Sequence, residues 1–249
     1  MSEDLGGNTS AVRREGETVR RSLGPRRAAV HRWLRHLDGT PGVPRLIGID
    51  AGEEVLSLLP GGPPPEAPGE DAVAAAGRLL RRLHDASAGF DFGAPEDWPM
   101  ADPRRAEVIC HHDFAPYNLM WESGVPTGVV DFDLSGPGAR VTDLAYLAWW
   151  MAPLALASDK AAETEAAITA GLPRLRLLCA AYGAPTDAGL VSEIHAVLTR
   201  MADPARAAAA LGPQPAARLM KGGHFAYWHR EAAAFAAAMP RIEAALGLG

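Results

Sequence analysis

Residues 108–118 read VICHHDFAPYN, and residues 128–150 read GVVDFDLSGPGARVTDLAYLAWW. Each segment starts with a short apolar run, typical of a buried strand, and continues into polar side chains. Residues 122–127 (ESGVPT) favour a reversal of the chain, so the two apolar runs are expected to form a hairpin. Polar side chains of both segments should then meet in one pocket, although 18 positions separate Asp113 from Asp131. These polar residues are His111, His112, Asp113, Asn118, Asp131 and Asp133.

The residue types in this pocket suit phosphoryl transfer. The carboxamide of Asn118 and the carboxylate of Asp131 form an oxygen-only ligand set, which suits Mg²⁺, a hard ion that also binds phosphate oxygens. The carboxylate of Asp113 is not needed for the metal and can accept the proton of an attacking hydroxyl group. A metal that neutralises charge and a base that orients the nucleophile are what phosphoryl transfer requires. Asp133 is expected either to contact a second metal or to face solvent.

The composition indicates a globular protein with one large domain or two lobes. The chain has 249 residues, of which 48% are hydrophobic, and a net charge of −6, which does not favour nucleic acid as a partner. Its two cysteines, Cys110 and Cys179, make no disulfide framework, so a cytoplasmic location is expected. The first residues show no signal-peptide pattern, and no apolar run is long enough to span a membrane.

The first 60 residues predict a small lobe rich in strands. Strands are expected at residues 9–14, 18–21, 44–49 and 54–59, with one amphipathic helix at residues 27–37. A glycine-rich turn at residues 5–8 is either a plain β-turn or a phosphate-binding loop, in which case Gly7 contacts the nucleotide. The run Pro60–Pro65 is the strongest break in the chain, and we interpret it as a hinge between residues 1–60 and residues 61–249.

The chain beyond the hinge predicts a larger, mainly helical lobe. Residues 87–105 are expected to be irregular, and the hairpin described above follows them. Together the two parts predict an α+β protein with a nucleotide-binding cleft between a small β lobe and a helical lobe. The expected helices cover residues 71–86, 143–151, 160–170, 173–182, 188–201 and 214–246, the last as one or two helices.

The pattern H-x-D-x-x-x-x-N at residues 111–118, followed by D-F-D at residues 131–133, resembles the catalytic and metal loops of protein-kinase-like enzymes. It is closest to the aminoglycoside phosphotransferase and choline kinase branch, because the loop contains a proline and the segment closes with D-L-A at residues 143–145. The helix that ends in L-R-R-L-H at residues 80–84 is also similar to that family. The resemblance covers most of residues 6–150 and implies a protein-kinase-like two-lobed fold with a shortened N-lobe.

The resemblance also implies roles for single residues. Asp113 corresponds to the catalytic base, and Asn118 and Asp131 correspond to the Mg²⁺ ligands. His111 corresponds to the histidine that braces the catalytic loop, and we group it with the catalytic residues. Asp143 corresponds to the buried carboxylate that holds the loop backbone, and we expect it to cap the following helix. Three further residues are implied at the hinge, where backbone groups contact adenine: Leu58, Leu59 and Pro60.

The small lobe departs from the family pattern at its phosphate-binding lysine. Residues 1–60 contain no lysine, and the strand at residues 18–21 places Arg20 at the expected position, with Arg21 as the second choice. The helix at residues 27–37 contains no Asp or Glu to pair with such a cation; Val30 or His31 stands there instead. Arginine holds phosphate oxygens well but is not interchangeable with lysine. The usual Lys–Glu ion pair is therefore not expected.

Three functional hypotheses follow. The first is a kinase that transfers the γ-phosphoryl group of Mg·ATP to a hydroxyl of a small molecule bound by residues 151–249, in a monomer or homodimer. That segment has a net charge of +1, which gives no special support for a polycationic antibiotic; amino alcohols, sugars and other natural products stay open. The second is a pseudokinase or nucleotide-binding module. The third is a metal-dependent hydrolase, although adjacent histidines on a strand point to opposite faces.

Overall fold

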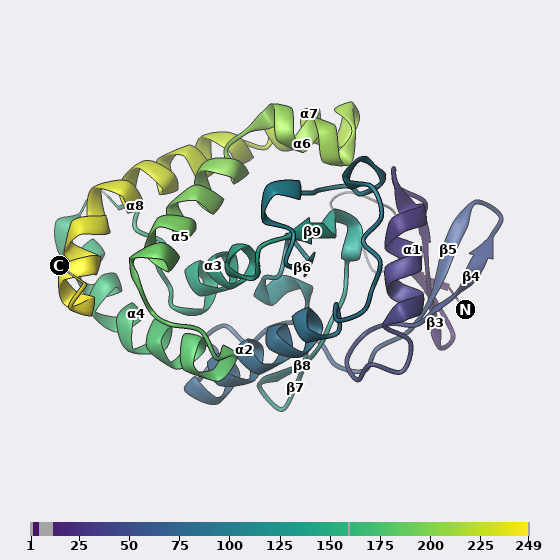
Figure 1. The fold of residues 1–249 in the computed structure, drawn as a ribbon, viewed down its shortest axis with the longest axis horizontal. Coiled ribbons are helices and arrows are strands. Elements are labelled where there is room, and N and C mark those ends of the chain that lie inside the picture. Colours follow the sequence, from purple (N-terminus) through teal and green to yellow (C-terminus); the bar gives the residue numbers. More distant parts are fainter. Residues whose placement is uncertain (1, 5–11, 159, 249) are drawn as a thin grey trace.

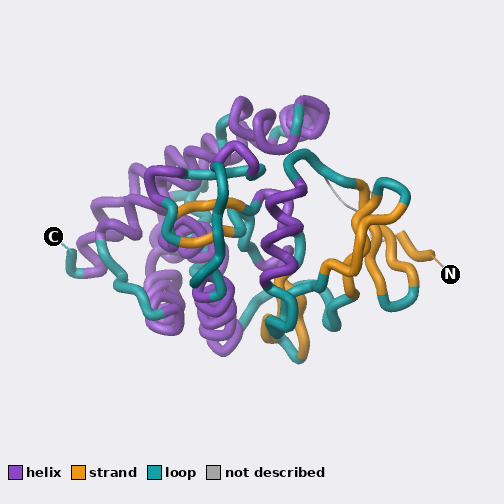
Figure 2. The backbone as a smooth tube through the Cα atoms, turned by 45° about the vertical axis from the view of Figure 1, so that its right-hand side comes forward, coloured by secondary structure: helices purple, strands orange, loops and turns teal. Residues whose placement is uncertain are grey.

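The small lobe of the computed structural model is an antiparallel sheet with one helix, as expected. The structure describes residues 2–4, 12–158 and 160–248. Five strands lie in the order β1-β2-β3-β5-β4. At the opposite end of the molecule lie the long helices of the large lobe (Figure 1), so strands and helices are largely segregated (Figure 2). The elements of the small lobe are β1 (Ser2–Asp4), β2 (Val12–Glu15), β3 (Thr18–Ser22), α1 (Arg27–His36), β4 (Leu46–Asp50) and β5 (Glu53–Ser57).

Helix α1 forms because its apolar residues recur at helical spacing. Val30, Trp33 and Leu34 form one stripe and are almost completely buried. The stripe joins the same core cluster as the apolar residues of the large lobe. The strand β1 was not expected; it pairs with β2 in the register Ser2 to Glu15. The described part of the predicted strand 9–14 is β2, and Gly7 lies outside the described residues.

The connection between the lobes is packed against the large lobe. Gly61 has a φ of 115°, which favours glycine, and a Cβ there would lie 3.0 Å from the backbone N of Trp121. Gly62 exchanges two backbone hydrogen bonds with Trp121, at 3.0 and 3.1 Å. We keep the division between residues 1–60 and 61–249 as a proposal, and these contacts indicate that the chain turns here at a defined place.

The pairing of the central strands differs from the predicted hairpin. Strand β6 (Val108–Cys110) pairs with β9 (Gly136–Gly138), whereas β8 (Val125–Val129) pairs with β7 (Leu119–Glu122). The expected reversal exists, but it joins β7 to β8 through Ser123 and Gly124, which both have positive φ. Strand β7 was missed because it follows the catalytic loop directly. The two segments still meet, since the N–H of Val130 donates to the carbonyl of Asn118 at 2.9 Å.

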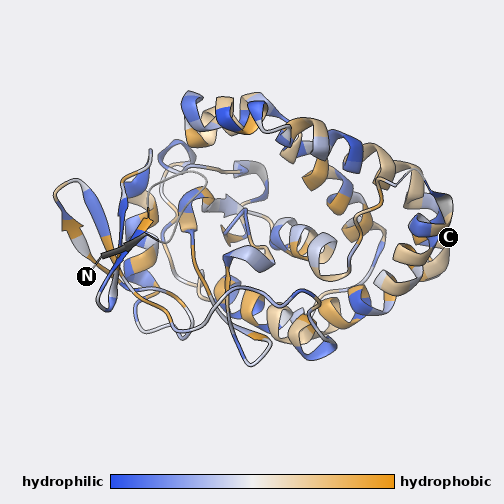
Figure 3. Cartoon of the chain, turned by 180° about the vertical axis from the view of Figure 1, so that it is seen from behind, coloured by the Kyte–Doolittle hydropathy of each residue, from blue (hydrophilic) through white to orange (hydrophobic). Residues whose placement is uncertain are grey.

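Helices make up most of the large lobe. Two predicted helices, at residues 160–170 and 173–182, are one helix in the structure, with Pro173 inside it. Their separation was wrong because close packing against α2 supports the helix across the proline. Polar and apolar residues alternate around these helices (Figure 3), as amphipathic helices around a core require. The helices are α2 (Glu70–Asp85), α3 (Arg140–Met151), α4 (Ala161–Tyr182), α5 (Ala188–Met201), α6 (Pro204–Leu211), α7 (Pro213–Lys221) and α8 (His224–Leu246).

Short 3-10 turns complete the large lobe. They are η1 (Pro95–Asp97), η2 (Pro103–Arg105), η3 (Pro116–Asn118) and η4 (Phe132–Leu134). The first two lie in the segment 87–105, which was expected to be irregular. None of the helices within the described ranges is both long and apolar enough to cross a lipid bilayer.

Candidate active site

A cavity of about 890 Å³ lies between the two lobes and contains most of the residues singled out in the sequence. Its volume is in the range of small-molecule sites. The small lobe contributes residues of β2, β3 and β5, and the large lobe contributes the catalytic loop, the metal loop and several helices. The residues named from the sequence that line the cavity are Arg21, Leu58, Leu59, His112, Asp113, Asn118, Asp131, Asp133 and Asp143.

Asp113 follows β6 and lies in the catalytic loop at the cavity wall. Its carboxylate accepts hydrogen bonds from the hydroxyl of Tyr117 at 2.5 Å and from Nδ2 of Asn118 at 2.8 Å. Burial raises the pKa of Asp113 to about 7, and the nearby Asp131 acts in the same direction, while the two hydrogen bonds lower it. A carboxyl group that titrates near neutral pH is suited to accept a proton from a substrate hydroxyl.

Asn118 and Asp131 offer oxygen atoms to a metal ion. Nδ2 of Asn118 is directed to Asp113, and its Oδ1 makes no hydrogen bond within the described part of the chain. One oxygen of Asp131 accepts from Arg21, and no hydrogen bond of the other oxygen occurs among the described residues. Asp131 has a φ of 64°, a left-handed conformation that is uncommon outside glycine. A carboxylate and a carboxamide oxygen in a cleft fit Mg²⁺.

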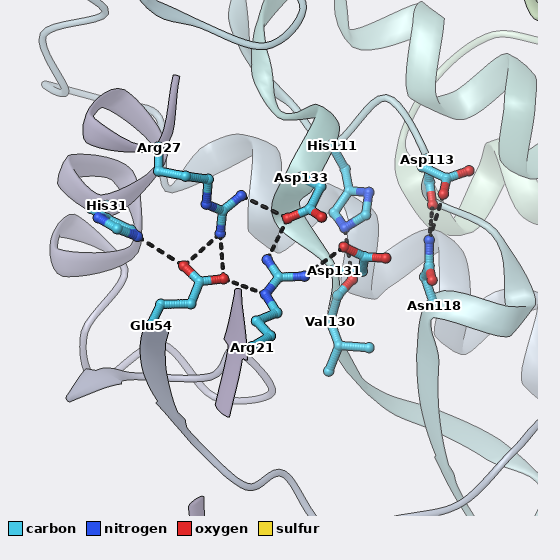
Figure 4. A network of polar contacts seen from close by, with 10 residues as sticks. All are labelled: Arg21, Arg27, His31, Glu54, His111, Asp113, Asn118, Val130, Asp131 and Asp133. Atoms are coloured by element: carbon cyan, nitrogen blue, oxygen red, sulfur yellow. Dashed lines mark hydrogen bonds and ion pairs between the residues drawn. The ribbon is translucent and has the colours of Figure 1, made fainter. Parts of the chain in front are cut away.

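A network of charged side chains joins the metal loop to the small lobe (Figure 4). The guanidinium of Arg21 binds Glu54, and it also binds Asp131 at 2.9 Å and Asp133 at 2.5 Å. Arg27 of α1 binds both Glu54 and Asp133 at 2.7 Å. Asp133 was expected to contact a metal or solvent, but in the structure it bridges the two arginines.

Glu54 is the acidic anchor that the sequence of α1 lacks. Its side chain is completely buried and accepts from Arg21, Arg27 and His31. Burial alone would raise the pKa of Glu54, but these three partners lower it to about 2. The usual Lys–Glu pair does not form, because residues 1–60 contain no lysine, but an arginine–glutamate pair stands in the cleft instead. Strand β5 supplies the carboxylate, and α1 supplies two further donors.

Arg21, not Arg20, faces the cavity, so the assignment of Arg20 to the phosphate-binding position is wrong. Successive side chains of a strand point to opposite faces of a sheet, so only one of the two arginines can enter the cleft. Arg20 lies on the outer face and binds Glu15 at 2.6 Å and Asp50 at 2.8 Å. Arg21 stands opposite Glu54 in the β3–β5 register.

His111 supports the site through the backbone and does not line the cavity. Its Nε2 lies 2.9 Å from the carbonyl oxygen of Val130, and burial lowers the pKa of the ring. His111 therefore holds the metal loop, which corrects its grouping with the catalytic residues. The histidine pair does not share a ligand position, since His111 turns to Val130 while His112 lines the cavity.

Asp143 joins the catalytic loop to the helices behind it. Its carboxylate accepts from the N–H groups of His111 at 2.6 Å and His112 at 2.8 Å, and lies 3.1 Å from Nε2 of His84. Burial would raise its pKa, but the hydrogen bond from His84 and the charge of the histidines lower it to about 2. The expected N-cap was wrong, because α3 begins at Arg140 and Asp143 lies in its first turn.

The small-lobe end of the cavity is a slot lined by apolar side chains. The N–H of Leu58 already donates to the carbonyl of Glu17 at 2.9 Å, so a base held at this edge would use other backbone groups of Leu58 and Leu59. Sequence reasoning missed the side chains that form the slot, although alternation in β3 and β5 could have indicated two of them, Val19 and Leu56. They are Val12, Val19, Leu56, Met120 and Val130.

The opposite end of the cavity is formed by helices that the motifs did not indicate. Aromatic side chains of the catalytic loop, α3 and α8 line it, together with one arginine each from α5 and α6. Apart from Tyr117, which lies within the catalytic-loop motif, no short motif marks these residues, since they come from five segments of the chain. They are Tyr117, Tyr146, Trp150, Tyr227, Trp228, Arg200 and Arg206.

Solved structures that resemble this fold include small-molecule kinases and phosphotransferases. One is an ethanolamine kinase of Plasmodium vivax, with a TM-score of 0.62 and 10% identity over 94% of this chain and 81% of that chain. Another is a macrolide 2′-phosphotransferase of Brachybacterium faecium, with a TM-score of 0.55 and 17% identity over 94% of this chain and 91% of that chain. At such identities the likeness defines the fold, which is protein-kinase-like.

Sequence comparison defines the family. The model of the phosphotransferase enzyme family matches residues 94–178. The chain is also 34% identical over 192 residues to the trifolitoxin immunity protein of Rhizobium leguminosarum bv. trifolii, and the match covers 72% of each protein. The chain belongs to the phosphotransferase enzyme family, which confirms the resemblance to the aminoglycoside phosphotransferase and choline kinase branch.

Proposed function

We propose that the protein transfers the γ-phosphoryl group of ATP to a hydroxyl group of a small molecule. The observation that carries this proposal is the juxtaposition of Asp113, Asn118, Asp131 and Arg21 around one cavity. The pseudokinase alternative drew its support from the missing Lys–Glu pair, and the pair of Arg21 with Glu54 removes that support.

Each side chain has a separate part in the proposed reaction. The acceptor hydroxyl donates its proton to the carboxylate of Asp113 while its oxygen forms a bond to the γ-phosphorus, and the bond to the ADP oxygen breaks. Arg21 binds phosphate oxygens and opposes their charge, and Glu54 holds the guanidinium in place. The base of the nucleotide lies in the apolar slot. Asn118 and Asp131 would hold Mg²⁺, which neutralises phosphate charge when bound.

The test is acceptor-dependent release of ADP from Mg·ATP by the purified protein and by Asp113→Asn. Loss of a general base lowers the rate by about 10²- to 10⁴-fold, and nucleotide binding should persist in the variant because Asp113 does not touch the slot. The matched control is Asp85→Asn, on the surface of α2. If native protein and Asp113→Asn release ADP at the same rate with every acceptor, the proposed function is wrong.

The name of the 34% identical relative suggests a biological use. We infer that phosphorylation of a toxic small molecule at a hydroxyl group would abolish its binding to its target and so protect the cell. Expression of the native gene should raise the tolerated concentration of a sensitive toxin several-fold, and expression of Asp113→Asn should not. Equal protection by both would indicate protection by sequestration instead.

A further inference from the structure

Arg206 lines the same cavity as Asp113, at the end formed by helices, where the proposed acceptor would bind. We call this part the acceptor end. It belongs to α6 and is half-buried, and its guanidinium lies 3.7 Å from Sδ of Met100. No carboxylate forms an ion pair with it in the part of the chain that the structure describes. A half-buried guanidinium without a counterion is unfavourable, so an anionic group at this place would stabilise it.

The surrounding charges do not compensate Arg206. Burial lowers its pKa, and the guanidinium of Arg200 does so too, while Asp102 and Asp203 oppose this shift. The carboxylate of Asp203 is already used, because its Oδ1 accepts from the N–H groups of Ala205 at 2.8 Å and of Arg206 at 3.2 Å. Arg206 lines the cavity, and its Nε and Nη1 make no hydrogen bond to any residue that the structure describes.

The charged groups near Arg206 are a second arginine and Asp203, which also lines the cavity. Arg200 also lines it, although its guanidinium binds Glu193 at 2.6 Å. His112 lies close to both arginines, and burial lowers the pKa of its ring to about 4, so it is uncharged near pH 7. Because Glu193 balances the charge of Arg200, while no described residue forms an ion pair with Arg206, the charge left for a ligand is that of Arg206, which favours an anion.

Aromatic side chains form another part of the cavity wall. The rings of Tyr117 and Trp150 meet edge to face at a centroid distance of 5.5 Å, and those of Trp150 and Trp228 lie 6.4 Å apart. Tyr146 completes the wall beside Tyr117, with 3.0 Å between the two hydroxyl oxygens. Such a surface binds an aromatic or otherwise apolar body through contact area.

We propose that the acceptor is an aromatic or apolar molecule with an anionic group, a carboxylate or a phosphate ester, which Arg206 binds while its hydroxyl group faces Asp113. The proposal rests on the proposed phosphotransfer function for the role of that hydroxyl, but the anion subsite itself is a property of binding. It sets this protein apart from enzymes that phosphorylate polycationic acceptors.

The test uses three probes that share a benzyl alcohol and differ in charge: 4-(hydroxymethyl)benzoate, 4-(hydroxymethyl)benzamide and 4-(aminomethyl)benzyl alcohol. Ligand-observed NMR titrations of the full chain give their dissociation constants. The carboxylate should bind about tenfold more tightly than the amide, the amine should bind more weakly still, and Arg206→Gln should abolish the preference. Arg176→Gln is the matched control, since Arg176 carries the same charge and, among the described residues, donates to the carbonyl of Ala245 on the surface.

The outcomes separate this inference from the proposed function. Equal binding of the three probes, or an equal loss in Arg176→Gln, would overturn the anion subsite whatever the catalytic result. An Arg206-dependent preference for the carboxylate supports the subsite even where no ADP is released. ADP release with the amine but not with the carboxylate would uphold phosphotransfer and overturn the inference. A folded Arg206→Gln variant is recognised by unchanged binding of the amide.

Discussion

Arg21 binds three carboxylates in the cleft and is the residue on which nucleotide binding is expected to depend. Its partners come from both lobes, with Glu54 on β5 and the pair Asp131 and Asp133 on the metal loop. Burial opposes its charge, but these three neighbours raise the pKa of Arg21 above its ordinary value, so it stays protonated at every working pH. The guanidinium is thus a permanent cation held at the mouth of the proposed phosphate site.

The buried carboxylate of Glu54 should matter far more for stability than its neighbour Glu53. Glu54→Gln removes a buried charge from Arg21 and Arg27 and should lower the free energy of unfolding by about 3–5 kcal/mol. Glu53→Gln breaks one partly exposed ion pair with Arg13 and should cost less than about 1 kcal/mol. Urea denaturation at pH 7 measures both.

The same comparison has a defined pH dependence. The pKa of Glu54 is depressed to about 2 in the folded protein, so its stabilising effect is present above the pKa of the unfolded chain, about 4.3, and is lost as the pH falls toward 2. The difference in unfolding free energy between native protein and Glu54→Gln should shrink over that interval. If the difference in unfolding free energy stays constant from pH 6 to pH 3, Glu54 is not the ionised partner of the two arginines.

Tyr117 should set the pH at which the base works. The pKa of Asp113 is raised to about 7, so the deprotonated fraction, and with it kcat/KM, should rise with pH through about 7. Tyr117→Phe removes a hydrogen bond that favours the carboxylate, which should move this limb to higher pH. The control is Tyr227→Phe, because Tyr227 lines the same cavity without contacting Asp113, and this variant should leave the rise of kcat/KM at the same pH. If the rise stays at the same pH in Tyr117→Phe as well, the role of Tyr117 is contradicted.

At the scale of elements, α2 and α4 pack so closely that there is no room for a side chain at Gly77. A Cβ at Gly77 would lie 2.8 Å from the carbonyl oxygen of Leu178 and 3.2 Å from Cβ of Ala181. Both helices support the site, because His84 at the end of α2 contacts Asp143, and Tyr182 at the end of α4 contacts His84. A shift between these helices would therefore reach the catalytic loop.

Gly77→Ala should destabilise the protein although alanine is the better helix former. The gain of about 1 kcal/mol in helix propensity should be outweighed by overpacking against a backbone carbonyl, for a net loss of about 1–2 kcal/mol. Gly48→Ala is the control, because a Cβ there meets nothing within 4 Å. Thermal unfolding of both variants decides the point: a Gly77→Ala protein as stable as Gly48→Ala would mean that the helices can separate at no cost.

At the scale of the molecule, the ion pairs of Arg21 and Arg27 with the metal loop join the two lobes across the cleft. Phosphate groups of a nucleotide would compete with Asp131 and Asp133 for Arg21. A ligand that replaces these contacts binds both lobes at once, so it should stabilise the whole chain.

Mg·ATP at about one hundred times its Kd should stabilise the protein by about 2.7 kcal/mol, which corresponds to a rise in Tm of about 5–10 °C for a chain of this length. Arg21→Gln should lose most of this shift. Arg20→Gln should keep it, since Arg20 lies on the outer face of the sheet. An equal shift in both variants would mean that Arg21 does not contact the nucleotide; a loss in Arg20→Gln alone would restore the assignment from the sequence.

Much of this protein follows from the sequence alone. The proposed base and metal ligands lie within two short segments, so a local pattern is enough to find Asp113, Asn118 and Asp131. The division into a strand-rich and a helical part also follows, because hydrophobic periodicity is a local property. The family followed from the same motifs and is confirmed by comparison.

Tertiary structure decided what depends on pairing and packing. The choice of Arg21 over Arg20, and of Glu54 as its partner, required the register of β3 on β5, which no local pattern specifies. The continuity of helix α4 through Pro173 required its packing on α2. The part of the cavity lined by Arg206 and aromatic side chains required the catalytic loop, α3, α6 and α8 to converge. Local sequence therefore determined the motif residues, because they lie within short segments, whereas long-range packing determined which arginine lines the cavity and which side chains surround it.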